Sequence, residues 1–537
     1  MIIENLKYIP EKNSCQTLVD YAECLTDWYI DKIPIADRKR KGQYFTPKNV
    51  SELMVSLFEN IGKTGVIRIL DPGAGIGIFE SAFCEYVKSL KKKVKLSFVL
   101  YENDTNVIPF LKQNMQACKD DMAAKGFKIN YKIFEEDFIL SNVQIFNDLE
   151  EFDYNKNGYE FVILNPPYYK LNKNSPQVID LKSIVSGQPN IYPLFMAISA
   201  KLLKNGGQII ALTPRSYCSG LYFKAFRKWF FKTVKPRKIH LFDSRREIFK
   251  KYDVLQENVI LNAIKTSEIP ENIQISVSKG IPNNEETLMI RNTTYDKIVV
   301  ESNNDIVMRI PTSEIDELIA EHIDKFDDNL ETLGFNVSTG PVVPFRAKDF
   351  LLKSLHDGND FVPLIWMHNL VDGLIKWPLE KNDTPIGLTM TKTSVKILRP
   401  NKNYVLTKRF STKEGKQRIN AGIYLKKSSN SDFIGIENHI NYLYKKSGEL
   451  TLDEAHGIAS LLNSKLYNQY FQITNGSTQV NASEIRNLPL PSLEIIREIG
   501  YLIRNLKPSD NITREHIIIT ALKIDEKISR ESLTNDN

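Results

Sequence analysis

Short apolar runs alternate with amphipathic segments between about residue 40 and residue 265. The apolar runs predict buried strands, and segments with apolar residues every three or four positions predict helices. The expected strands are Val66–Leu70, Leu96–Tyr101, Lys128–Phe134, Phe161–Leu164, Gln208–Leu212, Lys238–Phe242 and Asn258–Lys265. The expected helices are Lys48–Glu59, Ile78–Leu90, one from about Thr105, Ile191–Leu203 and Leu221–Lys232. This alternation predicts an α/β domain with a doubly wound, mostly parallel sheet.

Two of these helices carry terminal signals. Thr46 is expected to be the N-cap of the helix Lys48–Glu59, with Pro47 as its first residue. Gly206 and Gly207 are expected to end the helix that starts at Ile191, because glycine commonly follows the last helical residue.

The pattern changes after about residue 270, and the regular alternation is lost from about residue 310. Short strands with turns are expected up to about residue 440, followed by helices over Leu452–Phe471 and Ile512–Ile528. We therefore expect three parts: an N-terminal helical extension over 1–40, a doubly wound domain over 41–310 and an α+β domain over 311–537.

Composition narrows the class of protein. At roughly 100–200 residues per domain, 537 residues allow two to four domains, and 42% hydrophobic residues suit a globular protein. We find no apolar run near the ~18 residues of a membrane span and no signal-peptide pattern in MIIENLKYIPEKN. The five cysteines form no CxxC and the seven histidines do not cluster. We expect a cytoplasmic protein without a membrane anchor, disulfide framework or metal.

The net charge of +6 is too small to identify a partner, but the basic residues are clustered. Runs occur at Arg38–Lys41, Lys91–Lys93 and Lys224–Lys238. The third run interleaves aromatic rings with cations, which suits a surface that faces phosphates. A helix with an ordinary solvated face is the alternative for each run.

The first strand leads into a glycine-rich loop. The chain reads DPGAGIGIF from Asp71, and Gly73, Gly75 and Gly77 would let the backbone approach a ligand and direct amides toward it. The spacing GxGxG differs from the GxGxxG of dinucleotide-binding loops. Asp71 would also repel a pyrophosphate, so we expect a ligand without one.

Acids follow the next two strands. Glu102 ends the second strand, where a carboxylate can accept both hydroxyls of a ribose. Asp137 follows the third strand and either accepts an exocyclic amine or caps the next helix. Phe138 beside it is suited to stack on a purine.

The fourth strand runs into NPPYY. Pro166 and Pro167 cannot donate to a sheet, so the strand must stop and Asn165 must lie at its carboxyl end. Open α/β sheets bind ligands at that edge. A simple turn is the alternative, since Asn-Pro often initiates one.

The motifs GQYFTP, DPGAGIGIF, YEN, EEDF and NPPY follow one another along the chain. In this order they resemble motifs X, I, II, III and IV of the gamma-class, TaqI-like N6-adenine DNA methyltransferases. The implied fold is a Rossmann-like S-adenosylmethionine-dependent methyltransferase sheet over 41–310, followed by an α+β DNA-recognition domain over 311–537. Stretches such as NVSTGPVVPF resemble the TaqI-like specificity domain loosely.

The resemblance assigns roles to the residues that match its motifs. The Asn165 side-chain oxygen and the Pro166 carbonyl would accept the amino hydrogens of a flipped adenine, and Tyr168 would stack on the base. Phe249 is expected to be a second stacking aromatic, with Tyr252 in reserve. The residues expected to bind S-adenosylmethionine are Tyr44, Phe45, Thr46, Asp71, Gly73, Gly75, Gly77, Phe79, Glu102, Asp137 and Phe138.

Other chemistries fit the sequence less well. A cytosine-C5 methyltransferase needs a nucleophilic cysteine, usually after proline, but the chain has no Pro-Cys and no cysteine near residues 165–169. Asn rather than Ser or Asp at position 165 favours adenine over cytosine N4.

The resemblance implies the modification enzyme of a type II restriction–modification system, acting on duplex DNA as a monomer. Its cognate restriction endonuclease is expected to be a separate chain. The alternatives are an RNA or protein-glutamine methyltransferase and a non-catalytic DNA-binding specificity protein. GQYFTP and the long C-terminal part favour DNA, while the intact Asn165, Tyr168 and glycine loop favour an enzyme.

Overall fold

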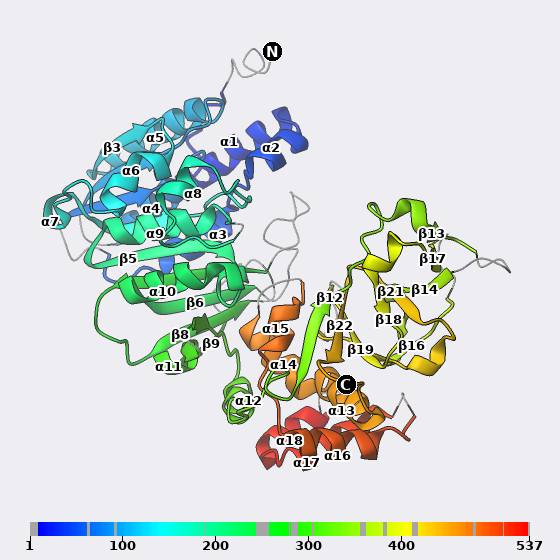
Figure 1. The fold of residues 1–537 in the computed structure, drawn as a ribbon. Coiled ribbons are helices and arrows are strands. Elements are labelled where there is room, and N and C mark those ends of the chain that lie inside the picture. Colours follow the sequence, from blue (N-terminus) through cyan, green and yellow to red (C-terminus); the bar gives the residue numbers. More distant parts are fainter. Residues whose placement is uncertain are drawn as a thin grey trace. The chain divides into compact units, whose positions relative to one another are not determined.

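The computed structural model describes residues 9–534 except for 62–64, 91–93, 188, 243–256, 279, 281–287, 303–304, 355–360, 380–383, 411–416, 476–478 and 508–509. The chain divides into two compact units (Figure 1). The first comprises Met1–Thr312 with Thr474–Gly476, and the second comprises Ser313–Ile473 with Ser477–Asn537. The helices of the expected N-terminal extension, α1 (Leu18–Lys32) and α2 (Ile35–Lys41), fall within the first unit.

The first unit contains a nine-stranded sheet in the order β3-β2-β1-β4-β5-β7-β6-β8-β9. Its strands are β1 (Val66–Asp71), β2 (Lys95–Tyr101), β3 (Lys128–Phe134), β4 (Tyr159–Leu164), β5 (Leu203–Pro214), β6 (Val234–Phe242), β7 (Asn258–Lys265), β8 (Ile273–Ser278) and β9 (Met289–Thr293). β1 to β5 pair in parallel, whereas β7 is antiparallel to both β5 and β6. The apolar pattern predicts β7 but not its direction, because alternation looks the same along a strand read either way.

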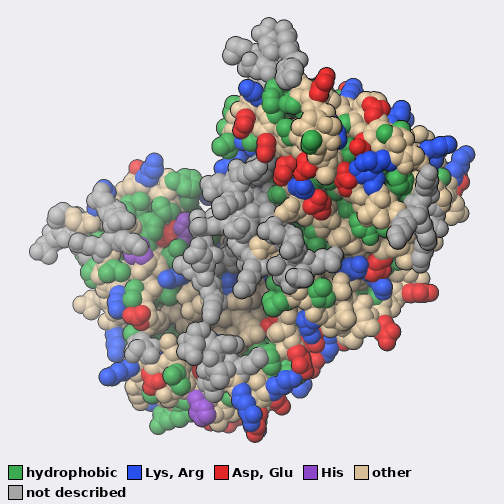
Figure 2. All heavy atoms as spheres, turned by 180° about the vertical axis from the view of Figure 1, so that it is seen from behind, with side chains coloured by type: hydrophobic (Ala, Val, Ile, Leu, Met, Phe, Trp, Pro, Cys, Tyr) green, Lys and Arg blue, Asp and Glu red, His purple; other side chains and the backbone are tan. Residues whose placement is uncertain are grey.

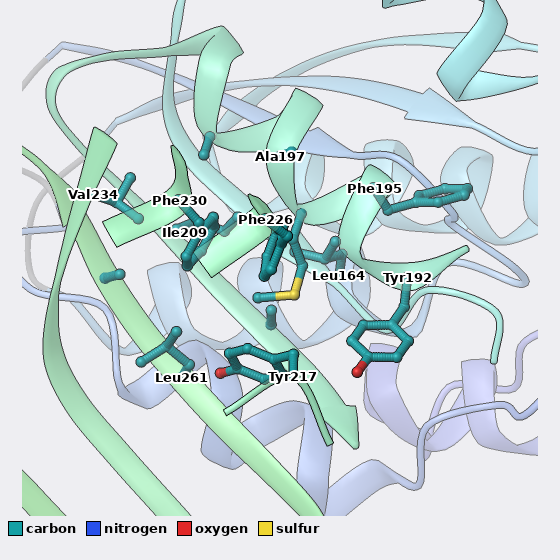
Figure 3. Close-up of a cluster of buried hydrophobic side chains, with 14 of the residues drawn as sticks. Leu164, Tyr192, Phe195, Ala197, Ile209, Tyr217, Phe226, Phe230, Val234 and Leu261 are labelled. Atoms are coloured by element: carbon teal, nitrogen blue, oxygen red, sulfur yellow. The ribbon is translucent and has the colours of Figure 1, made fainter. Parts of the chain in front are cut away.

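Helices cover both faces of this sheet, which confirms the doubly wound α/β fold. One face packs against α1, α3 (Lys48–Ser56), α4 (Ile78–Ser89) and α5 (Ile108–Ala124). The other packs against α6 (Phe138–Phe146), α9 (Tyr192–Leu202) and α10 (Lys224–Thr233). Figure 3 shows the second core, in which Leu164 and Ile209 lie near the rings of Tyr192 and Phe226. Neighbouring residues Ile163 and Ile210 belong to the opposite core, as the two-residue period of a strand requires.

The structure corrects both terminal signals. The N-cap of α3 is Pro47, and no side chain caps that helix. The Thr46 hydroxyl instead accepts a hydrogen bond from Asn165, a contact that local sequence cannot reveal.

The second correction concerns Gly206 and Gly207, which do not end a helix. α9 ends at Leu202 and β5 begins at Leu203. The register of β5 against β4 shifts between Leu203 and Gln208, and Gly206 there has a φ of 78°. The glycines therefore lie at an irregularity within the strand, and the left-handed backbone of Gly206 favours glycine at that position.

The second unit is α+β. Its strands are β12 (Phe335–Thr339), β13 (Leu351–Leu352), β14 (Phe361–Ile365), β15 (Leu370–Val371), β16 (Leu374–Ile375), β17 (Gly387–Thr389), β18 (Leu398–Pro400), β19 (Tyr404–Lys408), β20 (Ala421–Tyr424), β21 (Phe433–Ile436) and β22 (Ile440–Lys445). They form a six-stranded and a five-stranded sheet, ordered β12-β22-β19-β20-β16-β15 and β13-β17-β14-β21-β18. The helices are α12 (Glu314–Ile323), α13 (Leu452–Asn463), α14 (Lys465–Thr474), α15 (Ala482–Arg486), α16 (Leu493–Ile503), α17 (Asn511–Ala521) and α18 (Glu526–Thr534).

The helix expected over Leu452–Phe471 is in fact two helices. Ser464 is the C-cap of α13, with an extended ψ of 150°, and its hydroxyl donates to the Leu461 carbonyl. Serine competes for backbone hydrogen bonds in this way, so it interrupts a helix that the apolar pattern alone would continue. Within the described ranges, no helix has the length and apolarity needed to cross a membrane.

Candidate active site at the carboxyl end of the parallel strands

Asn165 lies immediately after β4, which is buried in the sheet of the first unit. Leu164, the last residue of β4, is fully buried in the core that Figure 3 shows. In that core the Tyr192 hydroxyl, from α9, lies 2.9 Å from the hydroxyl of Ser216, which follows β5. Parallel strands end at one edge of a sheet, so β4 and β5 bring Asn165 beside the residues that follow β5.

Three of the four hydrogen-bonding positions of the Asn165 amide are occupied. Its nitrogen donates to the Tyr44 carbonyl at 2.9 Å and to the Thr46 hydroxyl at 3.0 Å. Its oxygen lies 2.5 Å from the Tyr168 hydroxyl, which donates to it. An amide with both N–H groups engaged has one orientation, so its oxygen points away from Tyr44 and Thr46.

Tyr168, the expected stacking aromatic, contacts two other residues of the site. One face of its ring stacks on Tyr44, with centroids 6.0 Å apart and planes inclined by 18°. Its hydroxyl also lies 2.8 Å from the Leu212 carbonyl of β5, so its one hydrogen is shared between that carbonyl and the Asn165 oxygen. Burial raises the pKa of Tyr168 well above its usual value, so the phenol remains a proton donor.

The GQYFTP segment connects NPPYY with the glycine loop. Gly42, the C-cap of α2, has a φ of 65°, and a Cβ there would lie 2.9 Å from the Tyr169 ring. Phe45 covers Gly75, where a Cβ would lie 3.3 Å from the Phe45 ring. The structure thus brings together three motifs that are far apart in sequence.

Asp71 ends β1 and is completely buried. One carboxylate oxygen accepts from the Gly73 amide at 3.0 Å, and the other has no hydrogen-bond partner in the described structure. Burial raises the pKa of Asp71 to about 8; the Gly73 amide opposes this rise and the charge of Glu102 adds to it. A cationic ligand group would offset this cost of burial.

Glu102 follows the neighbouring strand β2 and faces the same loop. One of its oxygens accepts from the Gly75 amide at 3.0 Å, and the other accepts from the Asp104 amide at 2.8 Å. Burial raises the pKa of Glu102 to about 7. Each oxygen retains a second lone pair with which it can accept from a ligand hydroxyl.

Glu80 is an acid that the sequence analysis missed. It lies in the first turn of α4, is fully buried, and neither carboxylate oxygen has a partner among the described residues. Burial, and then the charge of Asp71, raises the pKa of Glu80 well above its usual value. The signal was available: Glu80 is the one charged residue in the apolar stretch IFESAF.

Two further residues expected to bind the cofactor, Asp137 and Phe138, make contacts that stabilise the fold. Asp137 is the N-cap of α6: one oxygen accepts from the Leu140 amide at 3.0 Å and the other from Gln177 at 3.1 Å. Phe138 is 2% exposed and packs against Tyr101 and Phe195.

Of the other expected site residues, Phe79 is buried in the core around α4. Phe249 and Tyr252 fall in the stretch 243–256, outside the described residues. Their expected roles stay predictions, as do the cofactor roles of Asp137 and Phe138.

The doubly wound sheet, with a glycine loop after β1 and NPPYY after β4, defines the class as an S-adenosylmethionine-dependent methyltransferase fold. A family model described as "Eco57I restriction-modification methylase" matches residues 83–249. The chain is 36% identical over 466 residues to the type II methyltransferase M.PstI of Providencia stuartii, covering 86% of this chain and 89% of that one. The type II methyltransferase M.BsuBI of Bacillus subtilis is 34% identical over 507 residues, covering 94% and 96%.

The chain therefore belongs to the type II methyltransferase family of restriction–modification systems. The resemblance drawn from its motifs is confirmed. A solved structure of the type IIL restriction–modification enzyme MmeI in complex with DNA matches 91% of this chain and 73% of that chain, with a TM-score of 0.51. At 12% identity this likeness concerns the fold alone.

Proposed function

We propose that the protein methylates N6 of adenine in duplex DNA, with S-adenosylmethionine as methyl donor, as the modification enzyme of a type II system. The observation that carries the proposal is the Asn165 amide at the end of β4. Its nitrogen is held at 2.9 Å from the Tyr44 carbonyl and 3.0 Å from Thr46, so its oxygen is a fixed acceptor. Pro166 follows directly and offers a carbonyl with no amide hydrogen.

A pair of acceptors is what this reaction requires. The adenine amino nitrogen is a poor nucleophile because its lone pair is delocalised into the ring. Acceptors at Asn165 and Pro166 would bind its two hydrogens and favour a pyramidal nitrogen with a localised lone pair. Pro167 stiffens the loop, so the acceptors are organised before the base arrives.

The residues around the glycine loop fit the proposed methyl donor. The unpartnered oxygen of Asp71 suits the ammonium group of its methionine part, and the free lone pairs of Glu102 suit ribose hydroxyls. The donor supplies an electrophilic methyl group on a sulfonium. The chain's own residues bind the donor, orient the amino group and exclude water.

An adenine in a duplex reaches this site only after leaving the base stack. Tyr168 offers a ring to the extruded base, and the second unit is the proposed target-recognition domain. One copy of the chain contains every group that the proposal uses, so a monomer suffices. The paired restriction endonuclease would be a separate protein.

Mass spectrometry of digested DNA tests this proposal. Purified protein is incubated with S-adenosylmethionine and mixed-sequence duplex DNA, beside Asn165→Ala and the control Asn130→Ala, an exposed residue of β3. We expect N6-methyladenine from the parent and the control, and a loss of at least 100-fold in Asn165→Ala, as for removal of one oxyanion-hole donor.

A parent protein that binds S-adenosylmethionine but yields no methylated adenine contradicts the proposal. The same assay on RNA and on protein glutamine then identifies the alternative substrates. Equal N6-methyladenine from the parent and Asn165→Ala would instead exclude the assigned residue.

A further inference from the structure

We infer that the backbone carbonyl of Tyr44 and the hydroxyl of Thr46 set the orientation of the Asn165 amide, which makes Thr46 a positioning residue for methyl transfer. The inference rests on the proposed function of Asn165. It also changes the expected role of Thr46, because its hydroxyl lies 3.0 Å from the Asn165 nitrogen rather than serving only the cofactor.

The Tyr44 carbonyl decides between the two possible orientations. A carbonyl can only accept, so the group 2.9 Å from it must be the amide nitrogen. Rotating the amide by half a turn would place two acceptor oxygens against each other. It would also direct N–H groups toward the position of the adenine amino group, which is itself a donor.

Thr46 completes this arrangement. Thr46 is only 5% exposed, and no side chain caps α3, so the helix does not use its hydroxyl. Opposite Thr46, the Tyr168 hydroxyl donates to the Asn165 oxygen at 2.5 Å. The three contacts together hold the amide plane while leaving the oxygen one lone pair for the base.

The same contacts explain why this chain carries asparagine at position 165. An ionised aspartate would bring a carboxylate oxygen to within about 2.9 Å of the Tyr44 carbonyl, with no hydrogen between them. A protonated aspartic acid could donate to that carbonyl and still accept with its other oxygen. The requirement for asparagine is therefore a requirement for a donor on the Tyr44 side.

The first experiment separates positioning from cofactor binding. Thr46→Val keeps the shape and removes the hydroxyl, Thr46→Ser restores a hydroxyl, and Thr26→Val is a matched control whose hydroxyl donates to Ala22 within α1. We expect kcat to fall about tenfold in Thr46→Val and to recover at least partly in Thr46→Ser. The S-adenosylmethionine Kd, measured by calorimetry, should change less than about twofold in every variant.

The outcomes are distinct. A raised Kd with unchanged kcat makes Thr46 a cofactor contact and overturns the inference, and unchanged values of both also overturn it. If Thr46→Val does not fold, Thr46→Ala replaces it. Its kcat is then compared with that of Thr46→Ser, which keeps a hydroxyl. If the unmodified protein does not methylate adenine, the proposed function itself is refuted. The reaction of the unmodified protein therefore tests that function separately from the variants.

The second experiment uses pH. The rate of Asn165→Asp is measured from pH 5.5 to 8.5 and divided by the parent rate at each pH. We expect this ratio to rise at least tenfold toward acid pH, because only the protonated side chain donates to the Tyr44 carbonyl. A ratio that is flat or falls toward acid pH overturns the inference.

Discussion

At the scale of single residues, the carboxylate of Asp71 is held in an unfavourable setting that a ligand would relieve. Burial raises its pKa to about 8, far above the value of about 3.9 in an unfolded chain. Between these two values the folded protein keeps a proton that the unfolded chain releases. Stability should therefore fall as pH rises from about 4 to about 8.

Asp71→Asn removes this ionisation. We expect its melting temperature to exceed that of the parent by several degrees at pH 8, with the gap closing toward pH 4. We also expect its affinity for S-adenosylmethionine to fall at least tenfold, because the negative charge that would pair with a cationic group is lost. Thermal melts across pH and calorimetric titration measure the two effects.

Asp20→Asn is the control with the opposite sign. The hydrogen bonds from Lys48 and then Thr17 lower the pKa of Asp20, so its carboxylate stabilises the fold above the unfolded value. Its replacement should lower the melting temperature at pH 8 without affecting cofactor affinity. Melting temperatures of the parent and Asp71→Asn that respond identically to pH would refute the role given to Asp71 burial.

At the scale of elements, the end of α2 determines where NPPYY lies. Gly42 closes α2 in a left-handed conformation and packs directly on Tyr168 and Tyr169. A side chain at this position would be strained by its φ of 65° and would also push the loop that carries Asn165. The helix terminus is thus part of the site's support.

Comparing Gly42→Ala with Gly206→Ala separates the effect of backbone strain from the effect of displacing the NPPYY loop. Both glycines have positive φ, but a Cβ at Gly206 would meet no atom within 4 Å, whereas one at Gly42 would lie 2.9 Å from the Tyr169 ring. We expect backbone strain to cost about 1–2 kcal/mol of stability in each variant, with a further loss in Gly42→Ala from the contact with Tyr169. Only Gly42→Ala should lower kcat substantially, by about tenfold, since small displacements of reacting groups are costly. Equal kcat values in the two variants would show that the contact does not position the loop.

At the scale of the whole molecule, charge should act mainly on DNA binding. Figure 2 shows Lys and Arg side chains interspersed with Asp and Glu over the visible face, and the net charge is only +6. Binding to phosphates would therefore depend on particular cations rather than on the overall charge.

Salt titrations test this expectation. The logarithm of the DNA affinity should fall linearly with the logarithm of salt concentration, while the S-adenosylmethionine Kd stays nearly constant. Lys170→Gln, exposed directly after NPPYY, should reduce the slope by about one unit. Lys128→Gln, exposed at the amino end of β3, should not. Identical slopes for both variants would place the DNA away from the NPPYY edge.

Much of this protein was determined by its sequence alone. Apolar runs located each of β1 to β7, because a strand buried in a sheet needs apolar residues in a short local stretch. The bounds of β5 and β6 were less accurate, since both strands begin several residues before the expected start. Glycines and prolines marked the loops that follow β1 and β4, because glycine permits backbone conformations that other residues avoid and proline cannot continue a strand. The order of these motifs was sufficient to identify the family.

Tertiary structure decided what the side chains contact. Threonine is a common N-cap residue, but the Thr46 hydroxyl accepts a hydrogen bond from Asn165, which lies 119 residues further along the chain. Of the two roles expected for Asp137, the structure shows the helix cap of α6, and the cofactor role stays a prediction. The Glu80 oxygens have no hydrogen-bond partner among the described residues. The antiparallel direction of β7 was equally hidden. The contact of Thr46 and the direction of β7 depend on which segments meet in space, and neither residue type nor local periodicity carries that information.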